Sequence, residues 1–124
     1  MIIGIGLDII EVERVAEKIE KQQGFRELVF AEAEIEYCEP KAHKYQHYAA
    51  RFAAKEAFFK ALGTGWASGT SFNEIVISGN DTGKPHISFT GRTAVTLQHL
   101  NPGRINVSLS HLKNIAAAVV VIEN

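Results

Sequence analysis

The sequence predicts an α+β fold in which a small, mostly antiparallel sheet packs against one long helix. A segment dense in alanine, lysine, phenylalanine and glutamate spans residues 43–62 and has the length and composition of a helix. Apolar runs rich in β-branched residues lie at both ends of the chain and predict strands. The later strand segments follow one another through short turns, which is typical of antiparallel pairing.

The first third of the chain predicts one strand followed by short helices. Residues 2–10 are almost continuously apolar, so we expect a strand that is buried on both faces. In segment 11–23 the apolar residues recur at helical spacing, and Gly24 fits the C-terminal cap of that helix. Residues 25–38 predict shorter helical pieces, whose packing residues are Phe30, Ile35 and Tyr37.

The rest of the chain predicts the long helix and then most of the sheet. Gly63 ends the long helix, and residues 63–72 form a loop. Turn-forming residues occupy positions 80–85. We expect a short helix at 92–100 and strands at 74–78, 86–90, 104–110 and 115–123.

Length and composition predict a single domain, residues 1–124. Apolar residues make up 46% and charged residues 22% of the chain, which excludes a disordered or coiled-coil protein. The net charge of −1 argues against a nucleic-acid binder. No apolar run approaches the about 20 residues that a membrane span needs, and the first residues do not form a signal peptide. We expect a cytoplasmic protein with no membrane partner, whose one cysteine, Cys38, is an inert thiol.

Charge is distributed unevenly along the chain. Residues 1–39 hold ten acidic and four basic side chains, whereas residues 40–60 hold one acidic and five basic side chains. Within the basic segment, Glu56 and Lys60 lie one helical turn apart, as do Arg51 and Lys55. Taken alone, this pattern is more typical of an ordinary solvated helix face than of a site.

Asp8 favours a functional interpretation of that helix. A carboxylate among isoleucines is costly to bury unless it is paired or binds a metal. Asp8 could cap the helix that starts near Glu11, or it could bind Mg²⁺ together with Glu56. In the second case the neighbouring lysines would neutralise phosphate charge.

Other segments carry single candidate residues. Lys84 lies in a Gly83-Lys84-Pro85 turn from which it could reach an anion, and His111 follows a strand, where sites often lie. A plain turn and a surface histidine are equally compatible with these patterns. His43 and His47 have the spacing of a zinc helix, but Lys44 stands where a catalytic glutamate belongs, which argues against a metalloprotease.

Two segments together resemble the signature of a known family. Gly6-Leu7-Asp8 and, at residues 52–60, the run FAAKEAFFK are similar to the two-part motif of the 4′-phosphopantetheinyl transferases. The short chain, the turn at residues 83–85 and the run SLSH at residues 108–111 resemble the single-domain type, the holo-acyl-carrier-protein synthases. The resemblance covers essentially the whole chain in order.

The resemblance implies transfer of 4′-phosphopantetheine from coenzyme A to a serine of apo acyl carrier protein, with release of adenosine 3′,5′-bisphosphate. It implies that Asp8 and Glu56 bind Mg²⁺ at the pyrophosphate, and that Glu56 or a metal-bound water deprotonates the serine. Lys60 would neutralise or protonate the leaving phosphate. Further coenzyme contacts would come from Arg51, Lys55, Lys84, Pro85 and His111.

The resemblance also implies a homotrimer with sites at the subunit interfaces. Arg14, on the first helix, is then a contact for the acidic carrier protein, although it could equally pair with Glu11 or Glu17. Two other functions use the same residues. A magnesium-dependent phosphohydrolase or nuclease would release products without labelling a carrier, and a non-catalytic coenzyme A or nucleotide-binding module would bind without turnover.

Overall fold

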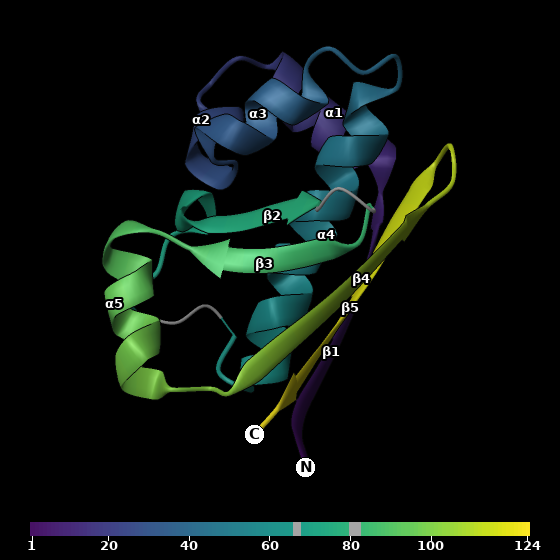
Figure 1. The fold of residues 1–124 in the computed structure, drawn as a ribbon. Coiled ribbons are helices and arrows are strands. Elements are labelled where there is room, and N and C mark those ends of the chain that lie inside the picture. Colours follow the sequence, from purple (N-terminus) through teal and green to yellow (C-terminus); the bar gives the residue numbers. More distant parts are fainter. Residues whose placement is uncertain (66–67, 80–82) are drawn as a thin grey trace.

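The computed structural model describes residues 1–65, 68–79 and 83–124 (Figure 1). The chain forms β1 (Ile2–Glu11), α1 (Val12–Glu20), α2 (Phe25–Val29), α3 (Glu32–Cys38), α4 (Lys44–Leu62), the 3₁₀ turn η1 (Phe72–Glu74), β2 (Ile75–Gly79), β3 (Pro85–Phe89), α5 (Gly91–Leu100), β4 (Arg104–His111) and β5 (Ile115–Glu123). The predicted α+β class is confirmed, because helices and antiparallel strands make up the fold.

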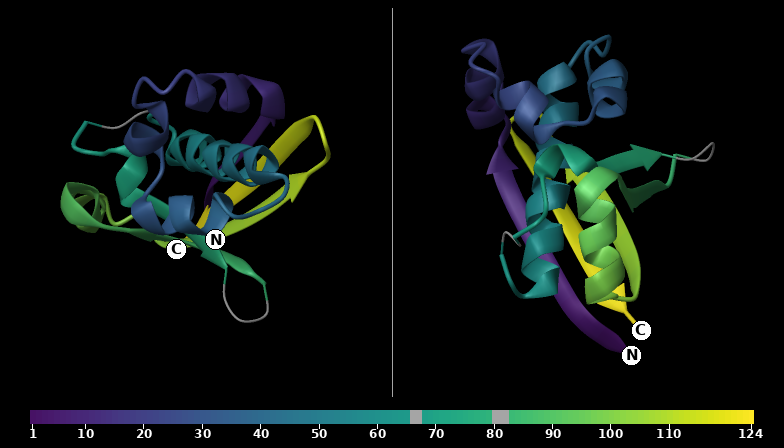
Figure 2. Two further views of the ribbon diagram at one scale, coloured as in Figure 1. Left: turned by 90° about the horizontal axis from the view of Figure 1, so that it is seen from above. Right: turned by 90° about the vertical axis from the view of Figure 1, so that its left-hand side faces the viewer.

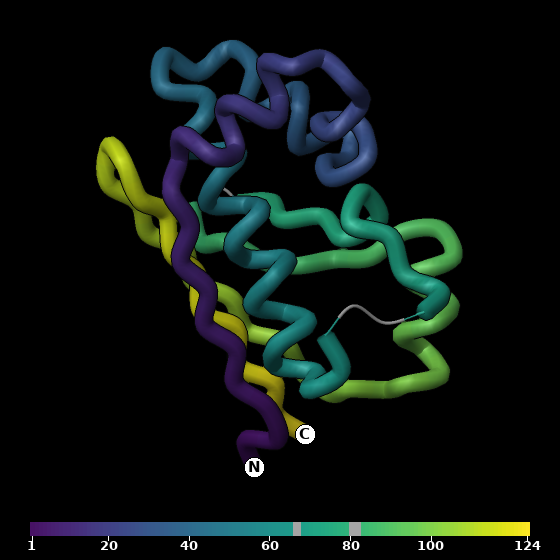
Figure 3. The backbone as a smooth tube through the Cα atoms, turned by 180° about the vertical axis from the view of Figure 1, so that it is seen from behind, coloured from purple at the N-terminus to yellow at the C-terminus, as the bar shows by residue number. Residues whose placement is uncertain are grey.

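The strands form two sheets rather than one. A three-stranded antiparallel sheet has the order β1-β5-β4, and β2 and β3 form a separate hairpin. Figure 2 shows this hairpin projecting away from the larger sheet, and Figure 1 shows α1, α2 and α3 gathered at one end of α4. Figure 3 shows β1 running along α4 and the two termini close together, where the Asn124 N–H donates to the Met1 carbonyl at 3.1 Å.

Glycines on β1 allow that strand to lie directly on α4. A Cβ atom at Gly6 would stand 1.8 Å from the carbonyl oxygen of Ala57, and one at Gly4 would stand 2.1 Å from that of Ala61. Both helix residues are alanines and are themselves buried. Small residues on both elements therefore set a close strand-to-helix distance, which holds the first half of β1 against the C-terminal part of α4.

The expectation that β1 is buried on both faces is wrong. Only the face that contains Gly4 and Gly6 lies against α4. Successive strand residues point to opposite faces, so Ile5, Leu7 and Ile9 point outward and are 62%, 64% and 68% exposed. A continuous apolar run shows that both faces of the strand are apolar, but it does not show whether residues of the same chain cover both faces.

Smaller differences concern the helix ends. α1 stops at Glu20, and Gly24, at φ +91°, precedes α2 instead of capping α1. Tyr37 is 44% exposed rather than a core residue, because it borders a cavity. α4 ends at Gly63 as predicted, with φ +80°. Parts of the predicted 63–72 loop and 80–85 turn, at residues 66–67 and 80–82, lie outside the described residues.

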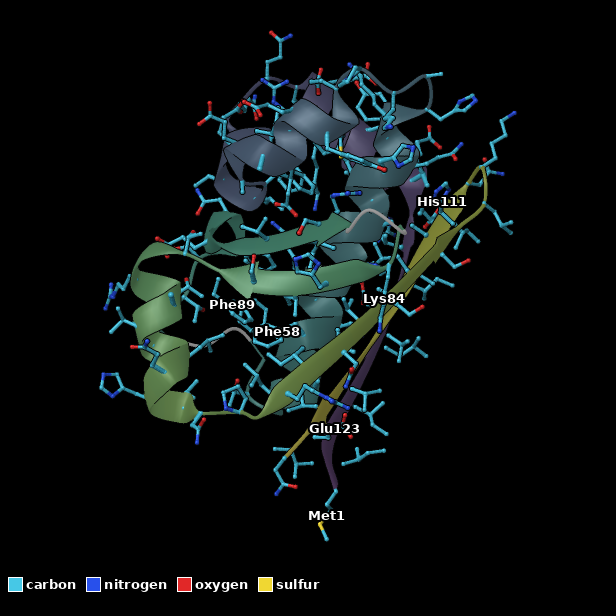
Figure 4. The ribbon with its side chains drawn as sticks, in the orientation of Figure 1. Met1, Phe58, Lys84, Phe89, His111 and Glu123 are labelled. Carbon is cyan, nitrogen blue, oxygen red and sulfur yellow. The ribbon has the colours of Figure 1, made fainter. Side chains whose placement is uncertain are left out.

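The core surrounds α4 on both sides. In Figure 4, Phe58 of α4 lies next to Phe89 of β3, and their ring centroids are 5.2 Å apart. A second apolar cluster under α1 to α3 contains Cys38, which is fully buried. Burial raises the pKa of the Cys38 thiol to about 11, which agrees with the predicted inert thiol. None of the described helices is long and apolar enough to cross a membrane.

Candidate active site

Asp8 of β1 and Glu56 and Lys60 of α4 form the first group of candidate residues. The Lys60 ammonium donates to Asp8 Oδ1 and to the Leu7 carbonyl oxygen, both at 3.0 Å. The Asp8 side chain is only 16% exposed. Glu11, rather than Asp8, occupies the cap position of α1, so the helix-cap interpretation of Asp8 is wrong.

The two carboxylates of this group lie close enough to affect each other. Burial raises the pKa of Glu56, and the negative charge of Asp8 raises it further, whereas Lys60 and Lys18 lower it. Lys18 of α1 is therefore a further cation near the group, and no sequence pattern predicted its position. Its signal was faint, because a lysine on a charged helix is commonplace.

The donor set of this group fits Mg²⁺. A cation between the two carboxylates would relieve their mutual repulsion. Mg²⁺ suits such a position, because it uses few protein ligands and keeps water or phosphate oxygens as the others. The described residues contain no cluster of three or more histidine, cysteine, aspartate or glutamate side chains that could hold a metal by themselves. A site of this kind thus needs oxygen atoms from a ligand or from water.

A second group of candidate residues lines a cavity of about 490 Å³ on the other side of α4. Its lining includes Tyr37, His47, Arg51, Pro85 and His111. The guanidinium of Arg51 lies 4.2 Å from the centroid of the Tyr37 ring. Within the described part of the chain, the buried Nε atom of Arg51 has no hydrogen-bond partner. A guanidinium that lines a cavity and has a donor without a partner favours an anionic ligand.

Lys84 lies between two residues that line this cavity, Gly83 and Pro85. It directly precedes the cavity-lining Pro85, at the start of β3. Figure 4 shows Lys84 at the loop end of the hairpin and His111 at the end of β4. Four of the five residues predicted to contact the coenzyme, Arg51, Lys84, Pro85 and His111, therefore lie at or beside one cavity.

Lys55, the fifth, does not lie with them. It is fully buried, and its ammonium donates to Glu34 Oε1 at 2.6 Å. It also donates to two backbone carbonyls, those of Val29 and Phe72, at 2.6 and 2.8 Å. Burial lowers the pKa of Lys55 to about 8, and the charge of Glu34 opposes that shift. An ammonium has three donors, so Lys55 has none left for a phosphate.

The two groups lie on opposite faces of α4. At about 100° per residue, Arg51 stands about 140° around the helix from Glu56, and His47 stands about 180° from it. In the sheet, β5 separates β1, which carries Asp8, from β4, which carries His111. A single chain thus does not bring the carboxylates and the cavity to the same surface.

Arg14 lies apart from both groups, on the surface of α1. Its side chain is 72% exposed and pairs with Glu11 at 3.3 Å. Exposed pairs of this kind are weak, so Arg14 remains available to an external partner.

Comparison with known proteins gives a consistent result. The family model for the 4′-phosphopantetheinyl transferase superfamily matches residues 4–120. A holo-[acyl-carrier-protein] synthase from Cytophaga hutchinsonii is 49% identical over 123 residues, which cover 98% of this chain and 97% of that protein. The corresponding protein from Koribacter versatilis is 39% identical and is covered completely, as is this chain.

Solved structures agree with this similarity. The crystal structure of the Neisseria meningitidis holo-[acyl-carrier-protein] synthase has a TM-score of 0.90 at 33% identity and covers 100% of both chains. The Bacillus anthracis synthase in complex with CoA (3′,5′-ADP) has a TM-score of 0.80 at 35% identity, covering 98% of this chain and 96% of that one.

Proposed function

The chain belongs to the 4′-phosphopantetheinyl transferase superfamily, and we propose that it transfers 4′-phosphopantetheine from coenzyme A to a serine of an apo acyl carrier protein. Its similarity to holo-[acyl-carrier-protein] synthases over nearly its whole length supports this reaction. So does the contact between Lys60 and Asp8, because it joins the two halves of the family signature, which lie more than forty residues apart in the sequence. Adenosine 3′,5′-bisphosphate is the second product.

Asp8 and Glu56 hold a magnesium ion in this proposal. The ion supplies positive charge to the pyrophosphate of the coenzyme when it is bound. Lys60 is 55% exposed, so its ammonium can turn from Asp8 toward a phosphate oxygen. Its charge then stabilises the negative charge that develops on the leaving phosphate.

The transfer breaks one bond between phosphorus and oxygen and forms another. The serine hydroxyl oxygen bonds to the phosphorus next to the pantetheine group, and the bond from that phosphorus to the bridging oxygen breaks. The hydroxyl proton passes to the carboxylate of Glu56 or to a water molecule beside it.

The remainder of the coenzyme occupies the cavity beside α4. Arg51 provides a buried cation with an unused donor, His111 adds an imidazole ring to the cavity wall, and Lys84 adds a charge beside the cavity-lining Pro85. Pro85 fixes the backbone beside Lys84. Lys55 is left out of this contact set, because all its donors are used within the chain.

The active enzyme is a homotrimer in which neighbouring subunits complete each site. Two features support this assembly. The carboxylate group and the cavity lie on opposite faces of α4, so one subunit can offer the first group to the second group of its neighbour. The outward face of β1 is apolar and exposed at Ile5, Leu7 and Ile9, and a second copy of the chain is a partner that would cover it.

Arg14 contacts the acidic carrier protein in this proposal. It lies on α1 three residues after the end of β1, the strand that carries Asp8. A carrier serine that reaches Asp8 and Glu56 would bring the acidic surface of the carrier over α1. The exposed guanidinium of Arg14 can exchange Glu11 for an external carboxylate at little cost.

The direct test is to incubate the protein with coenzyme A, Mg²⁺ and an apo acyl carrier protein and to weigh the carrier by mass spectrometry. We expect a mass increase of one phosphopantetheine group, which chelation of the metal prevents. Glu56→Gln should abolish the increase while the variant stays folded, and Glu32→Gln, at an exposed position on α3, should not change it. Release of phosphate or nucleotide without a labelled carrier would contradict the proposal.

A further inference from the structure

One titratable ring in the cavity beside α4 is not among the coenzyme contacts described above. His47 lies one helical turn before Arg51, and its ring centroid is 5.3 Å from that of His111 on β4. Tyr37 on α3 is a second ring neighbour, with centroids 5.8 Å apart. All four side chains line the same cavity of about 490 Å³.

We infer that His47 is a further coenzyme-binding residue, which takes up a proton when a phosphate group of the coenzyme enters the cavity and so adds a positive charge beside Arg51. The inference rests on the proposed coenzyme site. It assigns a role to a histidine whose helical spacing from His43 resembled a zinc motif but did not fit one.

The surroundings of His47 disfavour its charged form in the free protein. Burial lowers the pKa of His47, and the charges of His111 and Arg51 lower it further. Smaller effects of the same sign come from Lys41 and His43, in the segment between α3 and α4. The imidazole is therefore mainly neutral at neutral pH.

Among the described residues that line the cavity, the carboxylate that could offset these charges is Glu34, and it is already hydrogen-bonded. Glu34 of α3 lines the cavity, but its Oε1 atom accepts hydrogen bonds from Lys55 and the Ala31 N–H. Its Oε2 atom accepts from the Ile77 N–H at 3.1 Å. The aromatic rings of Tyr37 and His111 are the other near neighbours of His47.

A phosphate group would reverse this balance. An anion that binds the Arg51 guanidinium from the cavity would lie in the cavity that His47 also borders. An anion nearby favours the imidazolium form, both through its charge and through a hydrogen bond from the ring. Because binding and protonation are linked, coenzyme affinity should increase as the pH falls, by up to about tenfold per pH unit for one proton.

Isothermal titration calorimetry with coenzyme A at pH 7, in two buffers of different ionisation enthalpy, counts the protons taken up on binding. We expect the wild type and His99→Gln to take up the same number and His47→Gln to take up clearly fewer. His99 is a suitable control because it is exposed on α5 and does not line the cavity. His47→Gln should bind coenzyme A about three- to tenfold more weakly at pH 6, and within about twofold of wild type at pH 8.

Equal proton uptake by the wild type and a folded His47→Gln variant would overturn the inference. A wild type that does not bind coenzyme A at all would instead overturn the proposed function. If His47→Gln does not fold, NMR titration of the histidine rings in the wild type decides the question. The pKa of His47 should then be higher with coenzyme A bound than without it, and an unchanged pKa would contradict the inference.

Discussion

Lys55 and Glu34 form an ion pair with a nitrogen-to-oxygen distance of 2.6 Å, and neither side chain reaches solvent. Every donor of Lys55 is used, and both oxygens of Glu34 accept hydrogen bonds. The partners of the pair come from the segments around α2, α3, η1 and β2, so the pair ties four short elements to α4. Glu34 also lines the cavity, and the pair thereby fixes part of its wall.

Lys55→Met should destabilise the protein by about 3–5 kcal/mol, because it leaves the carboxylate of Glu34 buried without its cation. Urea unfolding monitored by circular dichroism measures the effect. Lys60→Met is a matched control on the same helix, since Lys60 is 55% exposed, and it should change stability by less than about 1 kcal/mol. Equal stabilities for the two variants would show that the buried pair contributes little.

Gly6→Ala should prevent β1 from lying on α4. The added Cβ would stand 1.8 Å from the Ala57 carbonyl oxygen, and neither atom belongs to a flexible side chain. We expect a large loss of thermal stability or failure to fold, read by a melting curve. Gly79→Ala is the control, because the nearest atom to its added Cβ, the Gly83 carbonyl oxygen, is 3.9 Å away. A Gly6→Ala variant that melts at the wild-type temperature would contradict the close packing.

Local patterns predicted the elements of this fold better than their tertiary partners. Helical composition and Gly63 predicted α4, and alternating residues predicted β4, because both signals lie within one segment. The exposed face of β1 could not be predicted, since an apolar strand residue such as Leu7 looks the same whether its own chain or another copy covers it. The burial of Lys55 depends on Glu34, 21 residues earlier in the sequence, and no local pattern links them.

The same difference between local patterns and tertiary contacts applies to the candidate site. Sequence patterns singled out Asp8, Glu56 and Lys60, and the structure brings Asp8 and Lys60 into contact. No sequence pattern placed Tyr37 or His47 beside a cavity, because Tyr37 looked like a packing residue and His47 stood out only by its spacing from His43. The two faces of α4 were not separated either, although the spacing of about 100° per residue contained that information.

Acid should destabilise the protein partly through Glu39. A hydrogen bond from the buried Tyr48 hydroxyl lowers the pKa of Glu39, and Lys44 lowers it further. A carboxyl group with a lowered pKa adds stability above its unfolded-state pKa, near 4.5, and loses it as the pH falls through the folded-state value. Wild type should therefore exceed Glu39→Gln in stability at pH 7, and the difference should shrink as the pH falls below 4.5.

Urea unfolding at pH 7, 5 and 3 tests this prediction. Glu36→Gln is the control, since Glu36 is an exposed residue of α3 and should show the same stability as wild type at each pH. A difference between wild type and Glu39→Gln that stays constant with pH would assign the contribution of Glu39 to something other than its charge.

Leu7→Glu should dissociate the proposed trimer. Leu7 is 64% exposed on the outward face of β1, so a glutamate there is harmless to the single chain but would bury charge in an interface. We expect light scattering after size-exclusion chromatography to give the monomer mass, together with loss of transferase activity. Leu28→Glu, at an equally exposed leucine on α2, should leave the assembly intact. A trimeric Leu7→Glu variant would exclude this face as the interface.

If each active site is shared between two subunits, two inactive variants should complement each other, which a monomer with a complete site of its own would not allow. Glu56→Gln removes the carboxylate group, and Arg51→Met removes the cavity cation while keeping most of the side-chain volume against Tyr37. Each variant alone should transfer little or no phosphopantetheine. In mixed trimers, some interfaces would join an intact carboxylate group from one subunit to an intact cavity from its neighbour. Co-expressed variants should therefore regain part of the wild-type activity. Absence of any recovery in trimers shown by mass spectrometry to contain both variants would mean that each chain uses both of its own groups, despite their positions on opposite faces of α4.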